Sequence, residues 1–211
     1  MIERYTFHER ICHWLTGFAY TYCLMTGLAL YTPYLFWMAV ILGGGPVSRF
    51  WHPWVGVAFV AAAVWMHALW RGDMVLSDAD KRWLDSTKQY ATNQDASLPP
   101  QGRFNAGQKV FYWLMYYGAI VLLISGLVMW FPELVPFSWR AIRPIFVILH
   151  ECAALVTIGA FILHIYMGLF FVPGSLDGML FGRVSRQWAK AHHRLWFEHA
   201  TGETSRKEPL V

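Results

Sequence analysis

Residues 144–172 read PIFVILHECAALVTIGAFILHIYMGLFFV, and Pro173 follows them. The run contains one charged residue, Glu151, and two histidines, His150 and His164. A helix needs about 20 predominantly apolar residues to cross the hydrocarbon core of a bilayer. This run is long enough, so it predicts a membrane-spanning helix that carries two histidines.

Three more apolar segments precede that run along the chain. They cover residues of about 12–31, 53–70 and 110–131. Proline is favoured in the first turn of a helix, so Pro53 is expected to open the second segment. The chain is 56% hydrophobic and only 14% charged, whereas soluble domains carry about 25% charged residues. We therefore predict an all-α integral membrane protein, a single domain whose four transmembrane helices form a bundle.

The distribution of basic residues predicts the orientation of these helices. Fourteen of the seventeen Lys and Arg residues lie in the N-terminal arm, the loop 71–109 and the tail 173–211. The other three, Arg49, Arg140 and Arg143, lie in the connections on the opposite side. Loops rich in Lys and Arg stay in the cytoplasm, so both termini, the long loop and the tail are expected there. The positive charge is thus assigned to membrane topology, and no nucleic-acid motif points to a nucleic-acid partner.

The cysteines argue against several kinds of site. There are three of them, Cys12, Cys23 and Cys152, and all lie in or beside apolar segments. An odd number in such places argues against a disulfide framework. The sequence has no CxxC or CxxCH motif, so neither a zinc site nor covalently attached c-type haem is expected.

His150 and His164 share one face of the predicted fourth helix. Fourteen residues at 100° each bring the second histidine to within about 40° of the first, and at 1.5 Å per residue the two lie about 21 Å apart along the axis. A two-histidine zinc motif would need its ligands one turn apart instead. The separation suits two large cofactors at different depths in the bilayer.

A haem b held by two imidazoles needs a second histidine at each depth. In the predicted topology His150 lies toward the periplasm and His164 toward the cytoplasm. His52 opens the second segment on the periplasmic side, and His13 opens the first on the cytoplasmic side. We therefore predict two haems b, one held by His52 and His150 and the other by His13 and His164. Iron with two axial imidazoles has no open position, which favours one-electron transfer across the membrane.

A small residue follows each of these four histidines at the fourth position, where a large side chain would obstruct a porphyrin. The four small residues are Gly17, Gly56, Ala154 and Gly168. Alternatively, a single histidine in a membrane helix is a hydrogen-bonded packing residue.

The remaining histidines are assigned other roles. His67 is an alternative to His13 as the partner of His164, but Arg71 follows it where a small residue is needed, which favours packing or a bond to a haem propionate. His8 precedes the first helix. His192, His193 and His199 are expected to be solvated residues of the tail.

Two segments of the sequence resemble each other. Residues 26–33 read TGLALYTP and residues 125–132 read SGLVMWFP. The repeat reflects either two-fold descent or two helices that end alike.

Six segments, spread over nearly the whole chain, carry a resemblance to a known family. They are RICHW (10–14), WHPWVG (51–56), FNAGQK (104–109), ILHE (148–151), ILHIYM (162–167) and GRVSRQWAKAHH (182–193). Together they resemble the membrane cytochrome b (gamma) subunit of respiratory formate dehydrogenase. The FNAGQK block is the most specific of the six.

The resemblance implies two partners, an iron–sulfur beta subunit and a catalytic alpha subunit with molybdenum or tungsten. Formate would be oxidised in the alpha subunit, so no catalytic residue is assigned to this chain. Electrons would enter at the periplasmic haem and reach menaquinone or ubiquinone near the cytoplasmic haem. The quinone-binding positions implied are Asn105, Gly107 and His164. Alternatively, Asn105 simply caps the third helix.

Two other functions stay open from the sequence. One is the cytochrome b subunit of a nickel–iron hydrogenase or another respiratory reductase, which would share the histidine pattern. The other is a haem-free membrane anchor or transporter, in which the buried histidines would bind protons or ions.

Overall fold

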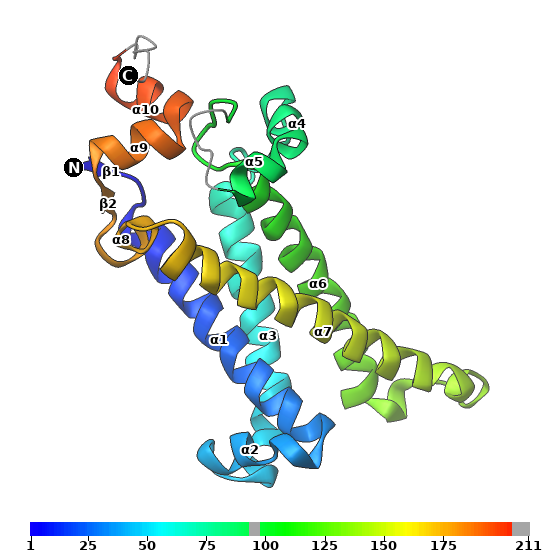
Figure 1. Cartoon of the computed structure of the whole chain (residues 1–211). Helices are drawn as coiled ribbons and strands as arrows, with labels where there is room; N and C mark the ends of the chain where they lie inside the picture. The colour runs from blue at the N-terminus through cyan, green and yellow to red at the C-terminus, as the bar shows by residue number, and fades with distance from the viewer. Residues whose placement is uncertain (93–97, 204–211) are drawn as a thin grey trace. The chain divides into compact units, whose positions relative to one another are not determined.

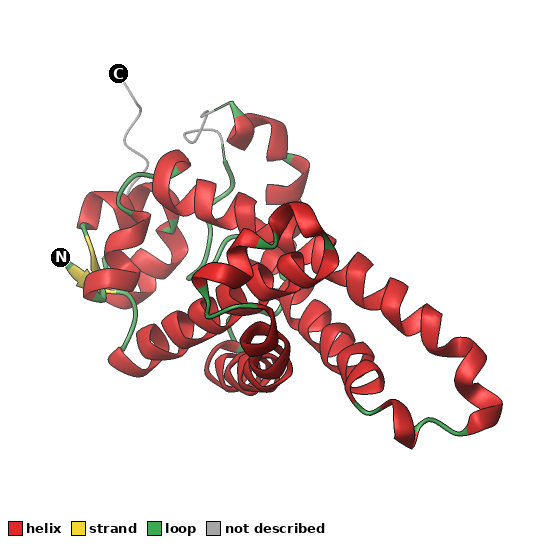
Figure 2. Cartoon of the chain, turned by 90° about the horizontal axis from the view of Figure 1, so that it is seen from below, coloured by secondary structure: helices red, strands yellow, loops and turns green. Residues whose placement is uncertain are grey.

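The computed structural model describes residues 1–92 and 98–203. Their regular structure is helical except for two short strands, as Figure 2 shows. The long helices are α1 (Phe7–Tyr31), α3 (Gly45–Trp70), α6 (Ala106–Trp130) and α7 (Arg143–Tyr166), which continues as the π-helical turn η5 (Met167–Phe171). They are labelled in Figure 1.

Short elements connect these helices. Between α1 and α3 lie η1 (Pro33–Leu35) and α2 (Trp37–Ile41). Between α3 and α6 lie α4 (Asp78–Asp85) and α5 (Thr87–Ala91), and between α6 and α7 lie η3 (Pro132–Leu134) and η4 (Phe137–Ile142). After η5 come α8 (Ser175–Phe181), α9 (Arg186–His192) and α10 (Arg194–Thr201). Strand β1 (Ile2–Glu3) pairs antiparallel with β2 (Arg183–Val184).

The chain forms two compact units. The helical unit comprises residues 8–69 and 113–166, and so holds most of the four long helices. Among the described residues, the terminal unit comprises 1–7, 70–92, 98–112 and 167–203.

Within the described residues, three helices are long and apolar enough to cross a membrane. They are Gly45–Trp70, Ala106–Trp130 and the continuous segment Phe137–Phe171. Large apolar side chains on α7 face outward, such as Ile148, Val156 and Ile162, which are 58–62% exposed. Side chains of this kind need lipid or another protein around them. The all-helical architecture predicted from the sequence is therefore confirmed, with membrane-spanning character in three helices.

The start of α3 differs from the sequence expectation. Gly43 and Gly44 have φ angles of 97° and 98°, a region that favours glycine, and they turn the chain after α2. The helix begins at Gly45, so Pro46 takes the first-turn position that had been assigned to Pro53. Pro53 lies inside the helix. His52 consequently lies about two turns inside α3 and does not open it.

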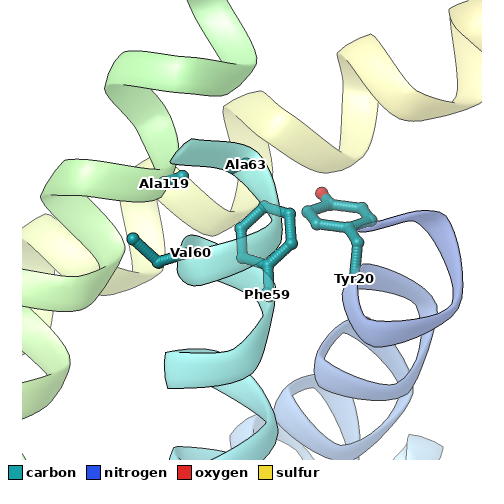
Figure 3. Packing of buried hydrophobic residues seen from close by; sticks show 5 residues of the cluster. All are labelled: Tyr20, Phe59, Val60, Ala63 and Ala119. Carbon is teal, nitrogen blue, oxygen red and sulfur yellow. The ribbon is translucent and has the colours of Figure 1, made fainter. Parts of the chain in front are cut away.

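The core of the helical unit lies midway along α1, α3 and α6. Figure 3 shows its buried residues, which are Tyr20, Phe59, Val60, Ala63 and Ala119. The Tyr20 ring packs on Phe59 and on Phe161 of α7, with centroids 5.4 and 4.9 Å away. Large rings that fill the space between helices fix the helices against one another.

The terminal unit contains a buried basic cluster around Arg4, which is only 3% exposed. Arg4 Nη2 donates to the Arg103 carbonyl (2.8 Å) and to His193 Nε2 (3.0 Å), and His193 Nδ1 donates to the Gly102 carbonyl (2.8 Å). Burial and the neighbouring Arg4 charge hold the pKa of His193 well below its usual value, so the ring is neutral. The expectation that His193 is a solvated tail residue is therefore wrong.

Candidate haem-ligand pairs

His52 of α3 and His150 of α7 face each other in the helical unit. Their ring centroids are 6.3 Å apart, with the ring planes inclined by 64°. The sequence predicted this pair from depth alone, and the structure brings the two rings together.

A hydroxyl group fixes each of these two rings. Thr26 Oγ1 lies 2.8 Å from His52 Nδ1, and Ser125 Oγ lies 2.9 Å from His150 Nδ1. Each hydroxyl already donates to a carbonyl four residues back on its own helix, at 2.8 Å for Thr26 and 2.6 Å for Ser125. Its oxygen can therefore accept from an imidazole Nδ1–H, and in that tautomer the Nε2 lone pair of each ring is available to a metal.

A glycine follows each hydroxyl residue and makes room for the same ring. A Cβ atom added to Gly27 would lie 3.3 Å from His52 Cε1, and one added to Gly126 would lie 3.3 Å from His150 Cε1. The Nδ1–Cε1 edge of each imidazole thus rests on a hydroxyl–glycine pair. The sequence repeat at residues 26–33 and 125–132 contains these two pairs, so it marks equivalent contacts to the two histidines.

His13 of α1 and His164 of α7 form a second pair in the same unit. Their ring centroids are 6.0 Å apart, with the planes inclined by 54°. His13 Nδ1 is buried and has no hydrogen-bond partner among the described residues. The edge of Trp14 lies against the His13 ring, with centroids 5.5 Å apart.

The spacing within both pairs fits an iron atom between the rings. With metal–nitrogen bonds of about 2 Å and each centroid roughly 1 Å beyond its nitrogen, two axial imidazoles have centroids about 6 Å apart. Among the described residues, no three His, Cys, Asp or Glu side chains cluster as a protein-only metal site would require. Haem needs only two, because its porphyrin supplies the other four ligands.

The small residues predicted to make room for porphyrin lie in varied surroundings. A Cβ atom at Gly17 or Gly168 would meet nothing within 4 Å, so both positions border open space. At Gly56 it would approach only Cys23 Sγ, at 4.0 Å. Ala154 is partly exposed on α7.

His67 lies against aromatic residues of α6. Its ring stacks on Tyr116, with centroids 4.5 Å apart and planes inclined by 22°, and it meets the edge of Trp113 at 5.8 Å. These contacts favour the packing role over the role of haem ligand.

The FNAGQK block has a structural part in the terminal unit. Asn105 Oδ1 accepts from the backbone N–H of Gln108 (2.9 Å), and Gln108 Oε1 accepts from the backbone N–H of Asn105 (3.0 Å). These two bonds form a capping box at the start of α6. A Cβ atom at Gly107 would lie 3.2 Å from the Trp83 ring, so this ring packs closely on the glycine. Asn105 therefore does cap the third long helix, and its side-chain amide nitrogen is not used in the cap.

Lys109 completes the block through a buried ion pair. Lys109 Nζ donates to Asp80 Oδ2 (2.8 Å) and to the Val75 carbonyl (2.9 Å), and both charged side chains are less than 10% exposed. Burial by itself would raise the pKa of Asp80. Hydrogen bonds from Lys109 and Ser77 outweigh burial and hold that pKa below its usual value.

Thr26 and Ser125 were not identified as site residues from the sequence. The signal was present in the TGL and SGL repeat, but nothing in a linear sequence shows which ring each hydroxyl meets. Thr26 and Ser125 meet histidines that lie 26 and 25 residues further along the chain.

Comparison with known proteins gives a consistent result. The profile of a family described as prokaryotic cytochrome b561 matches residues 4–182. The protein named formate dehydrogenase, cytochrome b556(fdo) subunit, of Escherichia coli (strain K12) is 34% identical over 208 residues, covering 98% of this chain and 96% of that protein. The nitrate-inducible cytochrome b556(Fdn) subunit of the same organism is 29% identical over 99% of this chain and 95% of its own length. The formate dehydrogenase cytochrome b556 subunit of Haemophilus influenzae is 28% identical over 93% of this chain and 82% of its own length.

Proposed function

The chain belongs to the prokaryotic cytochrome b561 family, and we propose that it is the di-haem membrane subunit that carries electrons from a formate dehydrogenase to quinone. The observation that carries the proposal is the presence of two facing histidine pairs at the spacing that axial haem ligands require. Relatives named as formate dehydrogenase cytochrome b556 subunits match almost the whole chain. Haem b supplies a reversible one-electron couple when bound.

The residues of the chain set the two sites at different depths. His150 and His164 lie on one continuous helix, about 21 Å apart at 1.5 Å per residue. The apolar core around Tyr20 and Phe59 packs in the middle of the helical unit. Each pair would hold one haem b through its two imidazoles, and the chemistry that the haem would supply there is one-electron transfer without substrate binding at the metal.

We place α1 in the membrane as the fourth crossing. It has 25 residues, about 37 Å at 1.5 Å per residue, which exceeds the roughly 30 Å hydrocarbon core. It is more polar than the other three helices because its first turns carry Glu9 and Arg10 and its middle carries threonines 16, 21 and 26. Each of these hydroxyls donates to the carbonyl four residues back, at 2.8 Å, so none leaves an unsatisfied donor toward lipid. Four crossings with the basic segments inside put both termini in the cytoplasm of a bacterial inner membrane.

The partners proposed are an iron–sulfur beta subunit and a molybdenum or tungsten alpha subunit. Electrons from periplasmic formate oxidation enter at the pair His52 and His150 and leave at the pair His13 and His164. The quinone residues proposed are Asn105, Gly107 and His164. The amide nitrogen of Asn105, which the helix cap does not use, is the donor available to a quinone carbonyl.

Two variants of Asn105 test the quinone role separately from the cap. Asn105→Asp keeps an oxygen that can accept from the Gln108 amide, whereas Asn105→Ala removes both the cap and the donor. Loss of one hydrogen bond of about 1.4 kcal/mol corresponds to a roughly tenfold slower reaction. We expect formate-dependent quinone reduction by the purified complex to fall by about that factor in both variants, with the haem spectra unchanged.

Two results would count against this role for Asn105. If Asn105→Asp keeps full activity while Asn105→Ala does not, Asn105 is a cap alone. If either variant loses haem, its effect on activity does not come from the quinone site.

A further inference from the structure

The two histidine pairs differ in how their rings are held. In the pair His52 and His150, both Nδ1 atoms meet hydroxyl oxygens, at 2.8 and 2.9 Å. In the other pair, His13 Nδ1 is buried and unpartnered among the residues that the structure describes. The first pair therefore has a hydrogen bond on each ring, and the second lacks at least one of them.

A hydrogen bond at Nδ1 of an axial imidazole changes the reduction potential of the iron that the imidazole binds. An imidazole that donates its N–H to an acceptor becomes a more basic ligand, and its tautomer and orientation are fixed. A more basic ligand stabilises ferric iron relative to ferrous iron. Hydrogen bonding on both rings of a pair thus lowers the reduction potential of its haem relative to a pair in which one ring lacks such a bond.

We propose that Thr26 and Ser125 are positioning residues that lock His52 and His150 in the Nδ1–H tautomer and give the haem at this pair the lower reduction potential of the two. The inference rests on the proposed function, in which these histidines are axial ligands. Electrons that enter at this haem then pass downhill to the haem at His13 and His164. The direction of electron transfer across the membrane is then set in part by the hydroxyl groups of Thr26 and Ser125.

The contacts of Thr26 and Ser125 distinguish their hydroxyl groups from other hydroxyl groups on the helices. Each is at the same place in the repeat, one residue before a glycine whose missing Cβ leaves room for the Cε1 atom of the same ring. Each has its own proton committed to a helix carbonyl, so it acts as an acceptor toward the imidazole. Thr21 donates in the same way to the Gly17 carbonyl, at 2.8 Å, and among the described residues its hydroxyl has no hydrogen bond to an imidazole.

The test uses paired variants in the purified membrane protein with its haems. Thr26→Val removes the hydroxyl at nearly constant shape, and Ser125→Ala does the same on the opposite ring. Thr26→Ser and Ser125→Thr keep a hydroxyl at each position, and Thr21→Val is the control that removes a hydroxyl elsewhere on α1. The two haems are followed by redox titration of their visible absorption bands and by the electron paramagnetic resonance spectrum of low-spin ferric haem.

We expect Thr26→Val and Ser125→Ala each to shift the lower-potential haem upward and to alter its ferric spectrum, while the other haem stays unchanged. The haems of the variants that keep the hydroxyl, and those of Thr21→Val, should have the same reduction potentials as in the unaltered protein. If Thr26→Val fails to assemble, Ser125→Ala makes the same test at the other ring.

Unchanged titrations in both hydroxyl-free variants, or an equal shift of both haems, would overturn the inference while leaving two bound haems and the proposed function intact. A lower-potential haem that persists in His150→Ala would overturn it as well. Absence of haem from the unaltered protein would instead overturn the proposed function itself.

Discussion

His150→Ala should reduce the haem content from about two to about one per chain and stop formate-dependent quinone reduction. Even the loss of an outer partner of a metal ligand costs roughly 10–100-fold in metal affinity or activity, and the loss of the ligand itself costs more. The remaining haem, at His13 and His164, should keep its low-spin spectrum because its ligands are untouched. Haem is counted by pyridine haemochrome, and quinone reduction is measured in the assembled complex.

Double substitutions test the pairing directly. His52→Ala combined with His150→Ala should lose the same single haem as either change alone, because we propose that both residues bind one iron. His150→Ala combined with His164→Ala should lose both haems. His67→Ala should keep both, since its ring stacks on Tyr116. If His67→Ala loses a haem and His13→Ala does not, the second pair is wrongly assigned.

Asp80→Ala should destabilise the terminal unit more than any surface substitution. The change leaves the Lys109 ammonium group buried, with the Val75 carbonyl as its one remaining partner among the described residues, and it removes the capping box between Asp80 and Ser77. Loss of one partner of a buried ion pair costs on the order of 3 kcal/mol. The expected result is a lower thermal unfolding midpoint and faster proteolysis of the terminal unit near neutral pH, where the lowered pKa keeps the Asp80 carboxyl ionised in the unaltered protein.

The matched controls separate the buried charge from the general effect of a mutation. Asp78→Ala on the same helix breaks an exposed ion pair with Lys81 and should have no measurable effect. Asp80→Ala combined with Lys109→Met should be milder than Asp80→Ala alone, because the unpaired charge is gone. Equal damage from the single and double changes would mean that the cap, and not the charge, matters.

The long apolar helices could be predicted from the sequence because they depend on the length and polarity of each segment. The run around His150 and His164 is long, apolar and bounded by proline, so its helical character and the common face of its two histidines were predictable. The α3 boundary was missed because two prolines, Pro46 and Pro53, both satisfied the same local rule. Only the turn at Gly43 and Gly44 distinguishes them.

The hydroxyl contacts to the histidine rings were not predictable, because they join distant segments. Thr26 and Ser125 read as ordinary hydroxyls on apolar helices until the histidines they hold are placed beside them. His193 lies in a polar stretch that predicts exposure, yet it packs under Arg4, which comes from the other end of the chain. Asn105 was predicted both as a cap and as a quinone ligand, and only the cap is a contact within the chain.

The central claim, that two haems b are bound by the two histidine pairs, is tested most directly by one measurement. It is the dithionite-reduced minus oxidised visible spectrum of the purified membrane protein, with haem counted per chain by pyridine haemochrome. The account predicts low-spin haem b at about two per chain, as two bis-imidazole pairs require. A protein with no haem, or with one, would contradict it.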